Sequence, residues 1–307
     1  MPENLERVRS VGKLSATAMG CVAIGLWSTL AVLTRLSQPV PPFELSAIAF
    51  AVAFFGSVAY EGWRGKQLLH SLRQPIGLWI LGLMGIPGNI ILYFIALRHA
   101  PDSPVGVNLV NYLWPLLIVV LSNFVMKERL RWLQWVGIAM GVSGAVFAIN
   151  SDGQTGLQAR HATAYLLAFG SAVCWATYSV MSRRFFVTSR QVVMVFCGSA
   201  VLPVWVFHRL TEITVLPTTA LQWVAVVAMG LGPLGFAYYA WDCGMRKGNA
   251  RLLASAAFMI PIFSTLLLIA FNQAPFRRTI ALACGLVTGG VVLVSAGHRA
   301  TAPLGRG

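Results

Sequence analysis

The chain has 307 residues, of which 57% are hydrophobic and only 10% are charged. A soluble domain carries about a quarter charged residues, so this composition excludes an ordinary soluble enzyme and predicts an integral membrane protein. The net charge of +14 does not predict nucleic-acid binding, because the Lys and Arg residues lie in short connections between apolar runs rather than on one soluble face.

Ten apolar runs, each near the length that a membrane-spanning helix needs, follow one another along the chain. That length is about 20 residues, and the connections between the runs are short, with no inserted soluble domain. We therefore predict an all-α membrane protein with ten transmembrane helices. The predicted spans are Leu14–Leu36, Phe43–Trp63, Pro75–Leu97, Pro104–Val125, Trp132–Ile149, Ala162–Ser182, Gln191–His208, Thr218–Trp241, Leu252–Phe271 and Thr279–Gly297.

The basic residues predict how these spans are oriented. If the N-terminus lies inside, 17 of the 23 Lys and Arg residues fall in the tails and the inward-facing connections, and six fall outside. Positive charge accumulates in the cytoplasmic loops of membrane proteins. We therefore expect both termini to lie in the cytoplasm.

The two halves of the chain resemble each other at fixed offsets. Pairs matched at an offset of 148 or 146 residues are Trp27/Trp175, Thr29/Thr177, Val32/Val180, Arg35/Arg183, Pro115/Pro261, Arg131/Arg277 and Gly144/Gly290. Five spans per half is an odd number, so the second copy is inserted upside down relative to the first. We predict two inverted five-helix repeats, residues 1–150 and 151–307. This arrangement is typical of transporters that bind their substrate near the midplane and work by alternating access.

The fourth span carries an unusual polar stretch, in which two amides, a phenol and an indole precede Pro115. In a helix Asn108, Asn111 and Tyr112 share one face, because they lie three or four residues apart. A buried amide without a partner costs about 2–7 kcal/mol, so this face is expected to meet another helix, water or a ligand rather than lipid.

Similar residues recur at mid-span depth in other spans. A single aromatic residue in a membrane helix more often packs in the core or at the interface, but recurrence in five spans favours a central substrate cavity. The predicted substrate-binding residues are Asn89, Tyr93, Asn108, Asn111, Tyr112, Trp114, Trp27, Trp175, Tyr178, Tyr238 and Trp241. Pro115 and Pro261 are the predicted hinges, because proline removes a backbone donor and kinks a helix; a static kink explains them equally well.

Glycines recur in the fifth and tenth spans. They are Gly137, Gly141 and Gly144 in the fifth, and Gly285, Gly289 and Gly290 in the tenth. A Gly-x-x-x-Gly element lets helix backbones approach closely. We expect these two spans to brace each repeat by packing.

Charged residues at depth are scarce. Asp242 precedes Arg246 by four residues, the favourable order for an ion pair along a helix, so a structural role is expected ahead of proton transfer. No arginine lies at mid-depth to hold a strongly anionic substrate, which favours a zwitterionic or neutral solute. The five cysteines show no metal-ligand spacing, and no catalytic motif is present. We expect no metal, no cofactor and no enzymatic activity.

Three motifs carry a resemblance to a known family. They are residues 26–29 (LWST) in the first span, 110–115 (VNYLWP) in the fourth, and 235–238 (GFAY) followed by Ala240 and Trp241 in the eighth. With them the chain resembles the drug/metabolite transporter (DMT) superfamily, in the branch built of two EamA-type repeats, and more narrowly the YddG family of aromatic amino acid exporters. Asp242 departs from that pattern, which has an amide there.

The resemblance implies a secondary transporter of the bacterial inner membrane that exports aromatic and other neutral amino acids or related small metabolites. Its partners would be a small-molecule substrate and the lipid bilayer, without nucleic acid. The oligomeric state stays open, with a monomer as one option.

Three alternatives to this function remain. The first is a transporter of the same architecture for cationic drugs, sugar nucleotides or sugar and triose phosphates. The second is a channel, which would show conductance without saturation. The third is an intramembrane enzyme or sensor, which would need a reactive side chain at depth or an appended domain.

Overall fold

The computed structural model of the protein describes residues 2–64, 73–125, 131–149, 159–185, 190–272 and 278–299. These residues form helices and connections, without a strand. Eight helical segments among them are long and apolar enough to cross a membrane, and two shorter apolar helices, Trp132–Phe147 and Ala281–Val294, complete the ten. The prediction of an all-α protein with ten transmembrane helices is confirmed.

Several of the ten spans consist of more than one helix. The first five spans are, in chain order, α1 (Pro2–Ser28) with α2 (Leu30–Leu36); α3 (Pro42–Trp63); α4 (Ile76–Leu83) with η2 (Met84–Gly88) and α5 (Asn89–His99); α6 (Pro104–Asn111) with α7 (Trp114–Val125); and α8 (Trp132–Ile149). The second five are α9 (Ala162–Met181) with η4 (Ser182–Arg184); α10 (Arg190–Thr211); α11 (Ala220–Leu231) with η5 (Gly232–Phe236) and α12 (Ala237–Lys247); α13 (Ala250–Ala256) with η6 (Ala257–Met259) and α14 (Ile260–Ala270); and α15 (Arg278–Arg299).

The third and eighth spans each contain one π-helical turn, and the two turns lie at matching positions of the repeats. Residues 84–88 and 232–236 are 148 positions apart, the same offset that relates Trp27 to Trp175. Each turn contains a proline, which removes a backbone donor, and π-turns of this kind occur frequently at functional sites. Gly235 is required here, because a Cβ atom on it would lie 2.3 Å from the Gly230 carbonyl oxygen.

The fourth and ninth spans are broken at matching positions. One span over Pro104–Val125 was predicted, with a kink or hinge at Pro115; in the structure α6 ends at Asn111 and α7 begins at Trp114. The ninth span is interrupted by the 3-10 turn η6, just before Pro261. Pro115 and Pro261 provide the reason, since a proline lacks the amide donor for the preceding turn and its ring crowds the carbonyl four residues earlier.

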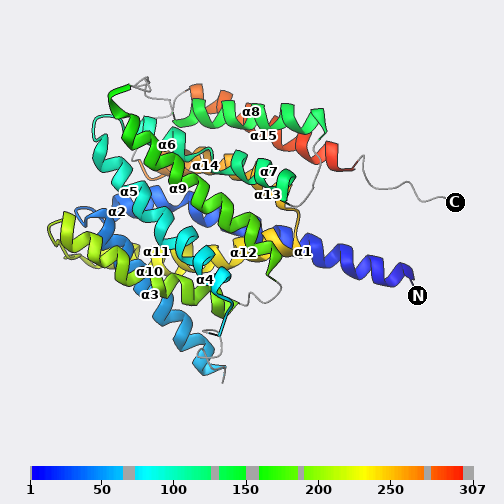
Figure 1. Ribbon diagram of the computed structural model, residues 1–307. Helices are drawn as coiled ribbons and strands as arrows, with labels where there is room; N and C mark the ends of the chain where they lie inside the picture. Colours follow the sequence, from blue (N-terminus) through cyan, green and yellow to red (C-terminus); the bar gives the residue numbers. More distant parts are fainter. Residues whose placement is uncertain are drawn as a thin grey trace.

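Figure 1 shows α8 and α15 along one edge of the bundle and α3 at the opposite edge, with α1, α9 and α12 between them. The start of α1 and the end of α15 lie on the same side of the bundle (Figure 1). We call this the terminal side; the far side is where α2 ends and α3 begins. An even number of spans requires this arrangement.

Two polar networks hold helix ends together on the far side. The Glu212 carboxylate accepts hydrogen bonds from the backbone N–H groups of Phe43 and Glu44 at 3.0 and 3.1 Å, and it contacts His208 Nδ1 at 2.9 Å. These bonds fix the start of α3 against the end of α10.

The second network joins the connection between α5 and α6 to the start of α9. Asp102 pairs there with Arg160 and, at 3.2 Å, with His161. Although desolvation acts to raise it, the pKa of Asp102 is lowered overall by a hydrogen bond from its own backbone and by the charges of Arg160 and His161.

The described residues include only some of the Lys and Arg residues on which the predicted orientation depends. Lys66, Lys127, Arg129, Arg277 and Arg306 contribute to the charge asymmetry but lie outside the described residues. The predicted boundary between the repeats, at residues 150 and 151, lies outside them as well.

Glycines allow α8 and α15 to pack backbone against backbone. A Cβ atom on Gly290 would lie 2.4 Å from the Gly137 carbonyl oxygen, and one on Gly144 would lie 2.5 Å from the Val287 side chain. Gly285 is different, because a Cβ there would meet nothing within 4 Å. Gly137, Gly144, Gly289 and Gly290 therefore face the partner helix closely, whereas a side chain on Gly285 would meet nothing.

We predict that Gly290→Ala destabilises the protein by about 1–3 kcal/mol, the usual cost of overpacking, because the added methyl group collides with the α8 backbone. Gly285→Ala is the matched control and should leave stability unchanged or slightly raise it, since alanine favours helix. Thermal or denaturant unfolding in detergent measures both. Equal stability of the two variants would contradict the backbone contact between α8 and α15.

Candidate functional site

Five aromatic rings from both halves of the chain meet in the core. The Trp27 ring lies 5.3 Å from Trp241, 5.5 Å from Trp175, 6.0 Å from Tyr238 and 6.3 Å from Trp114, measured between centroids. Each of the five side chains is at most 8% exposed. Most of the contacts are edge-to-face, the arrangement that aromatic pairs prefer. We call these five residues the ring cluster.

Buried hydrogen bonds fix the orientation of two indoles in the ring cluster. Trp27 Nε1 donates to the Pro233 carbonyl oxygen at 3.0 Å, which joins α1 to the π-turn η5. Trp241 Nε1 donates to Ser179 Oγ at 3.0 Å, which joins α12 to α9. The position of the rings is thus coupled to the π-turn of the eighth span.

A second group of side chains, the amide cluster, surrounds Ser171 of α9, which is fully buried. Its hydroxyl donates to the Asn89 carbonyl oxygen at 2.9 Å and accepts from the side-chain amides of Asn89 and Asn111 at 3.0 and 3.2 Å. One turn further along α5 and one turn earlier along α6, the Tyr93 hydroxyl donates to Asn108 Oδ1. The side-chain oxygens of Asn89 and Asn111 accept no hydrogen bond from the described residues.

The amide cluster and the ring cluster follow each other along the axis of the bundle. On α9, Ser171 precedes Trp175 by one helical turn, and on the fourth span Asn111 precedes Trp114. Both of these segments run from the far side toward the terminal side. The amide cluster therefore lies on the far side of the ring cluster.

Ten of the eleven predicted site residues belong to these contacts. Tyr178 extends the ring cluster, with its ring centroid 5.5 Å from that of Trp175. Tyr112 is the exception: it lies at the break between α6 and α7, half-buried against the core, without a ring contact to another described aromatic residue. The role of these residues in binding substrate, and that of Pro115 and Pro261 as hinges, stay predictions.

The predicted substrate-binding residues did not include Ser171, although it lies at helical spacing from Trp175 and Tyr178, and they did not include Ser179. Both are buried, and their hydroxyls hold Asn89, Asn111 and Trp241 in place. The signal was present, because Ser171, Trp175, Tyr178 and Ser179 share one face of a helix. Serine is so common in membrane helices that only the observed contacts distinguish these two.

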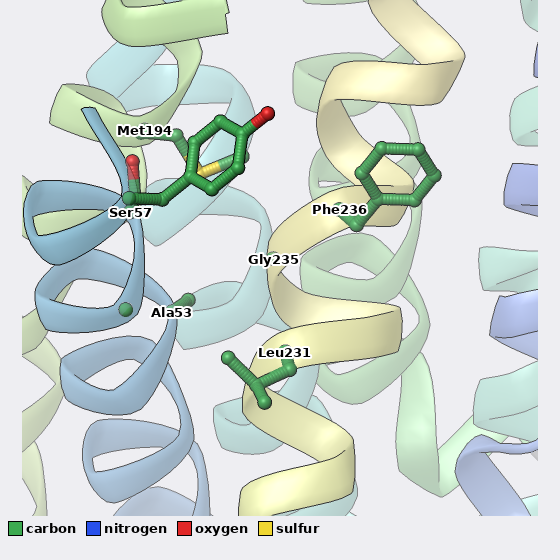
Figure 2. A pocket seen from close by; sticks show the side chains of 8 residues that line it. Ala53, Ser57, Met194, Leu231, Gly235 and Phe236 are labelled. Carbon is green, nitrogen blue, oxygen red and sulfur yellow. The ribbon is translucent and has the colours of Figure 1, made fainter. Parts of the chain in front are cut away.

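One cavity of the described part of the chain is lined by residues that belong to neither cluster. It has a volume of about 400 Å³ and opens between α3, α10 and the segment from α11 to η5. Figure 2 shows Ser57 and Met194 on one side of it and Leu231 and Gly235 on the other. The lining residues are Ala53, Gly56, Ser57, Tyr60, Met194, Leu231, Gly235 and Phe236. None of them is a predicted site residue, and Leu231 is 51% exposed on the surface of the bundle, so this is a lateral cleft. In this conformation the predicted site has its rings in mutual contact.

Comparison with known proteins identifies two matching segments. Residues 14–150 and 162–296 each match the EamA-like transporter family, so the matches cover most of the chain and fall on its two halves. One solved crystal structure of a protein 40% identical in sequence superposes with a TM-score of 0.86 and covers 93% of this chain and 99% of its own.

Several relatives carry a functional name. An aromatic amino acid exporter YddG from Ancylobacter novellus is 41% identical over 93% of this chain and 98% of its own length. Proteins of the same name from Salmonella typhimurium and Escherichia coli are 27% and 25% identical over 82% and 91% of this chain, and over 87% and 96% of their own.

We predict that Ser171→Ala destabilises the protein by about 1–3 kcal/mol, because it removes the hydroxyl that the half-buried side-chain amides of Asn89 and Asn111 share and that donates to the Asn89 backbone carbonyl oxygen. Ser199→Ala serves as the control, since the Ser199 hydroxyl donates to the Phe196 carbonyl oxygen of its own helix. Denaturant unfolding in detergent compares the two. A Ser171→Ala protein as stable as the control would show that the hydroxyl is dispensable to the amide cluster.

Proposed function

This chain belongs to the EamA-like transporter family, and from that premise we propose that it exports neutral amino acids, aromatic ones included, from the cytoplasm across a bacterial inner membrane. It is a transporter and not an enzyme. Two relatives that match nearly the whole length of the chain are named aromatic amino acid exporters. Their name supports this substrate class.

The observation that carries the proposal is the ring cluster with the amide cluster beside it. Ring faces and edges bind an aromatic or apolar side chain, while the unused oxygens of Asn89 and Asn111 suit the ammonium group of an amino acid. Small-molecule sites typically combine an apolar lining with a few placed polar groups in this way.

Alternating access is supported by the fact that the residues of the ring cluster come from both repeats. Trp27 and Trp114 belong to the first repeat, residues 1–150, whereas Trp175, Tyr238 and Trp241 belong to the second, residues 151–307. The rings touch across the boundary between the repeats, so a movement of one repeat against the other opens or closes the site. The breaks ahead of Pro115 and Pro261 lie at matching positions and serve as the hinges.

The orientation of the protein in the membrane is assigned by charge. The terminal side carries most of the Lys and Arg residues, and positive charge favours the cytoplasmic face. We place the terminal side in the cytoplasm and the far side, with the amide cluster, toward the periplasm. A monomer suffices for this mechanism, because each chain contains both repeats.

Counterflow of labelled solutes in proteoliposomes tests the proposal. We expect saturable counterflow of phenylalanine, tryptophan, methionine and threonine, and none of a sugar phosphate or a cationic drug. A protein that carried only a sugar phosphate or a drug would have the same architecture and another function. Conductance without saturation would instead indicate a channel.

We predict that Asn111→Ala and Trp114→Leu each lower the apparent affinity for phenylalanine about tenfold, which corresponds to ~1.4 kcal/mol. Trp205→Leu is the control for the indole, because Trp205 is 50% exposed on the surface of the bundle whereas Trp114 is 8% exposed. The measurement is the concentration dependence of counterflow by purified, correctly inserted protein. Wild-type affinity in both site variants would remove the ring and amide clusters from the binding site.

A further inference from the structure

A group of charged and polar side chains adjoins the ring cluster on its terminal side. Helix α12 continues past Trp241 with Asp242 and, one turn later, Arg246. Asp242 is only 4% exposed, and its Oδ2 atom accepts a hydrogen bond from Arg246 Nε at 2.8 Å. Arg246 also donates through Nη1 to the carbonyl oxygen of Phe185, at the end of the span that contains α9.

Three polar atoms of this group are buried without a hydrogen-bond partner among the described residues. They are Asp242 Oδ1, Arg246 Nη2 and the Tyr178 hydroxyl. A guanidinium group can bind both oxygens of a carboxylate through two parallel bonds, but here the pair is joined by one bond only. One carboxylate oxygen, Asp242 Oδ1, and one guanidinium nitrogen, Arg246 Nη2, therefore have no hydrogen-bond partner among the described residues. The Ser182 hydroxyl lies close enough to Asp242 to interact with its carboxylate, but its hydrogen bond in this conformation is directed to the Ser179 carbonyl oxygen, at 3.5 Å.

Unused groups of this kind are costly when they remain buried, because they have lost water without gaining a partner. The set is chemically specific: a carboxylate oxygen accepts from an ammonium group, a guanidinium nitrogen donates to a carboxylate, and a phenol does either. Together these atoms are complementary to the backbone of a free amino acid, which carries both charges. A solute with one charge would leave either the Asp242 carboxylate oxygen or the Arg246 nitrogen unpaired.

The position of the group fits a substrate on its way to the rings. Tyr178 packs on Trp175 with centroids 5.5 Å apart, and it interacts electrostatically with Asp242 and Arg246, so it connects the charged pair to the ring cluster. Along the axis the order from the far side is the amide cluster, the ring cluster, and then Asp242 with Arg246. An amino acid held by its backbone at this group has the ring cluster within reach of its side chain.

We infer that Asp242, Arg246 and Tyr178 form a zwitterion clamp, which binds the ammonium and carboxylate groups of a neutral amino acid on the terminal side of the rings. Asp242 binds the ammonium group, Arg246 Nη2 binds the carboxylate, and the Tyr178 hydroxyl bonds to either. The clamp rests on the proposed function and adds to it a second polar binding site, on the side of the ring cluster opposite the amide cluster. It also gives the Asp242–Arg246 pair a role beyond holding α12.

Three solutes with the same ring separate the two charges: phenylalanine, phenethylamine and 3-phenylpropionate. Each competes with labelled phenylalanine in counterflow by the full-length protein in proteoliposomes. We expect the wild-type protein to prefer phenylalanine about tenfold or more over either analogue. Asp242→Asn should reduce the preference over 3-phenylpropionate, which lacks the ammonium group, and Arg246→Gln should reduce the preference over phenethylamine, which lacks the carboxylate.

Tyr178→Phe is the decisive variant if the charge variants fail to fold. It removes only a hydroxyl that has no partner, so its unfolding midpoint should equal or exceed that of the wild type. We expect its half-saturating phenylalanine concentration to rise about three- to tenfold, the loss of one hydrogen bond. Tyr165→Phe is the matched control; its hydroxyl contacts Ser103 on the far side, and its transport constants should not change.

Unchanged half-saturation in Tyr178→Phe, together with an unaltered preference for phenylalanine in whichever charge variants fold, would overturn the clamp and indicate that these atoms bind water only. That result would leave the proposed function intact, since the wild-type protein would still carry phenylalanine. Absence of phenylalanine counterflow in the wild-type protein would overturn the proposed function and the clamp together.

Discussion

The need to satisfy buried polar groups inside the protein organises the core of this bundle. Lipid offers no hydrogen-bond partner, so every amide, indole and carbonyl at depth must be paired within the protein or with a ligand. The indole of Trp27 meets a carbonyl of the π-turn η5, and the Ser171 hydroxyl joins two asparagines from different spans. Each of these bonds connects elements that are far apart in sequence.

The inverted repeats place irregular backbone where it is useful. The π-turns of the third and eighth spans match at an offset of 148 residues, and the breaks in the fourth and ninth spans lie just before matched prolines. Irregular backbone is tolerated at membrane depth only where protein or a water-filled space covers it. The clusters lie at these irregular segments, with Asn89 directly after η2 and Trp114 at the start of α7. Regular helices such as α8 and α15 instead pack through glycine at the edge.

Much of the candidate site could be predicted from the sequence, because polar residues in apolar spans are conspicuous. Asn89, Asn111 and the tryptophans stand out at mid-span depth, and the physical cost of exposing an amide to lipid requires them to face inward. Ser171 was not selected, since a hydroxyl satisfied within its own helix looks the same in sequence as one that joins three spans. Pro115 predicted a kink or hinge in the fourth span but not that the helix ends at Asn111, because a proline does not say whether the helix continues.

Hydrophobicity and the residues matched between the two halves by themselves determined that this chain crosses a membrane ten times in two inverted halves, since the length of an apolar run and an odd number of spans per half leave few alternatives. Tertiary structure alone decided that the rings touch one another and that Ser171 joins Asn89 to Asn111. It alone also revealed that Asp242 and Arg246 each have one buried polar atom without a hydrogen-bond partner among the described residues. Such facts depend on the distance and direction between side chains of different helices, which spacing along one helix does not specify.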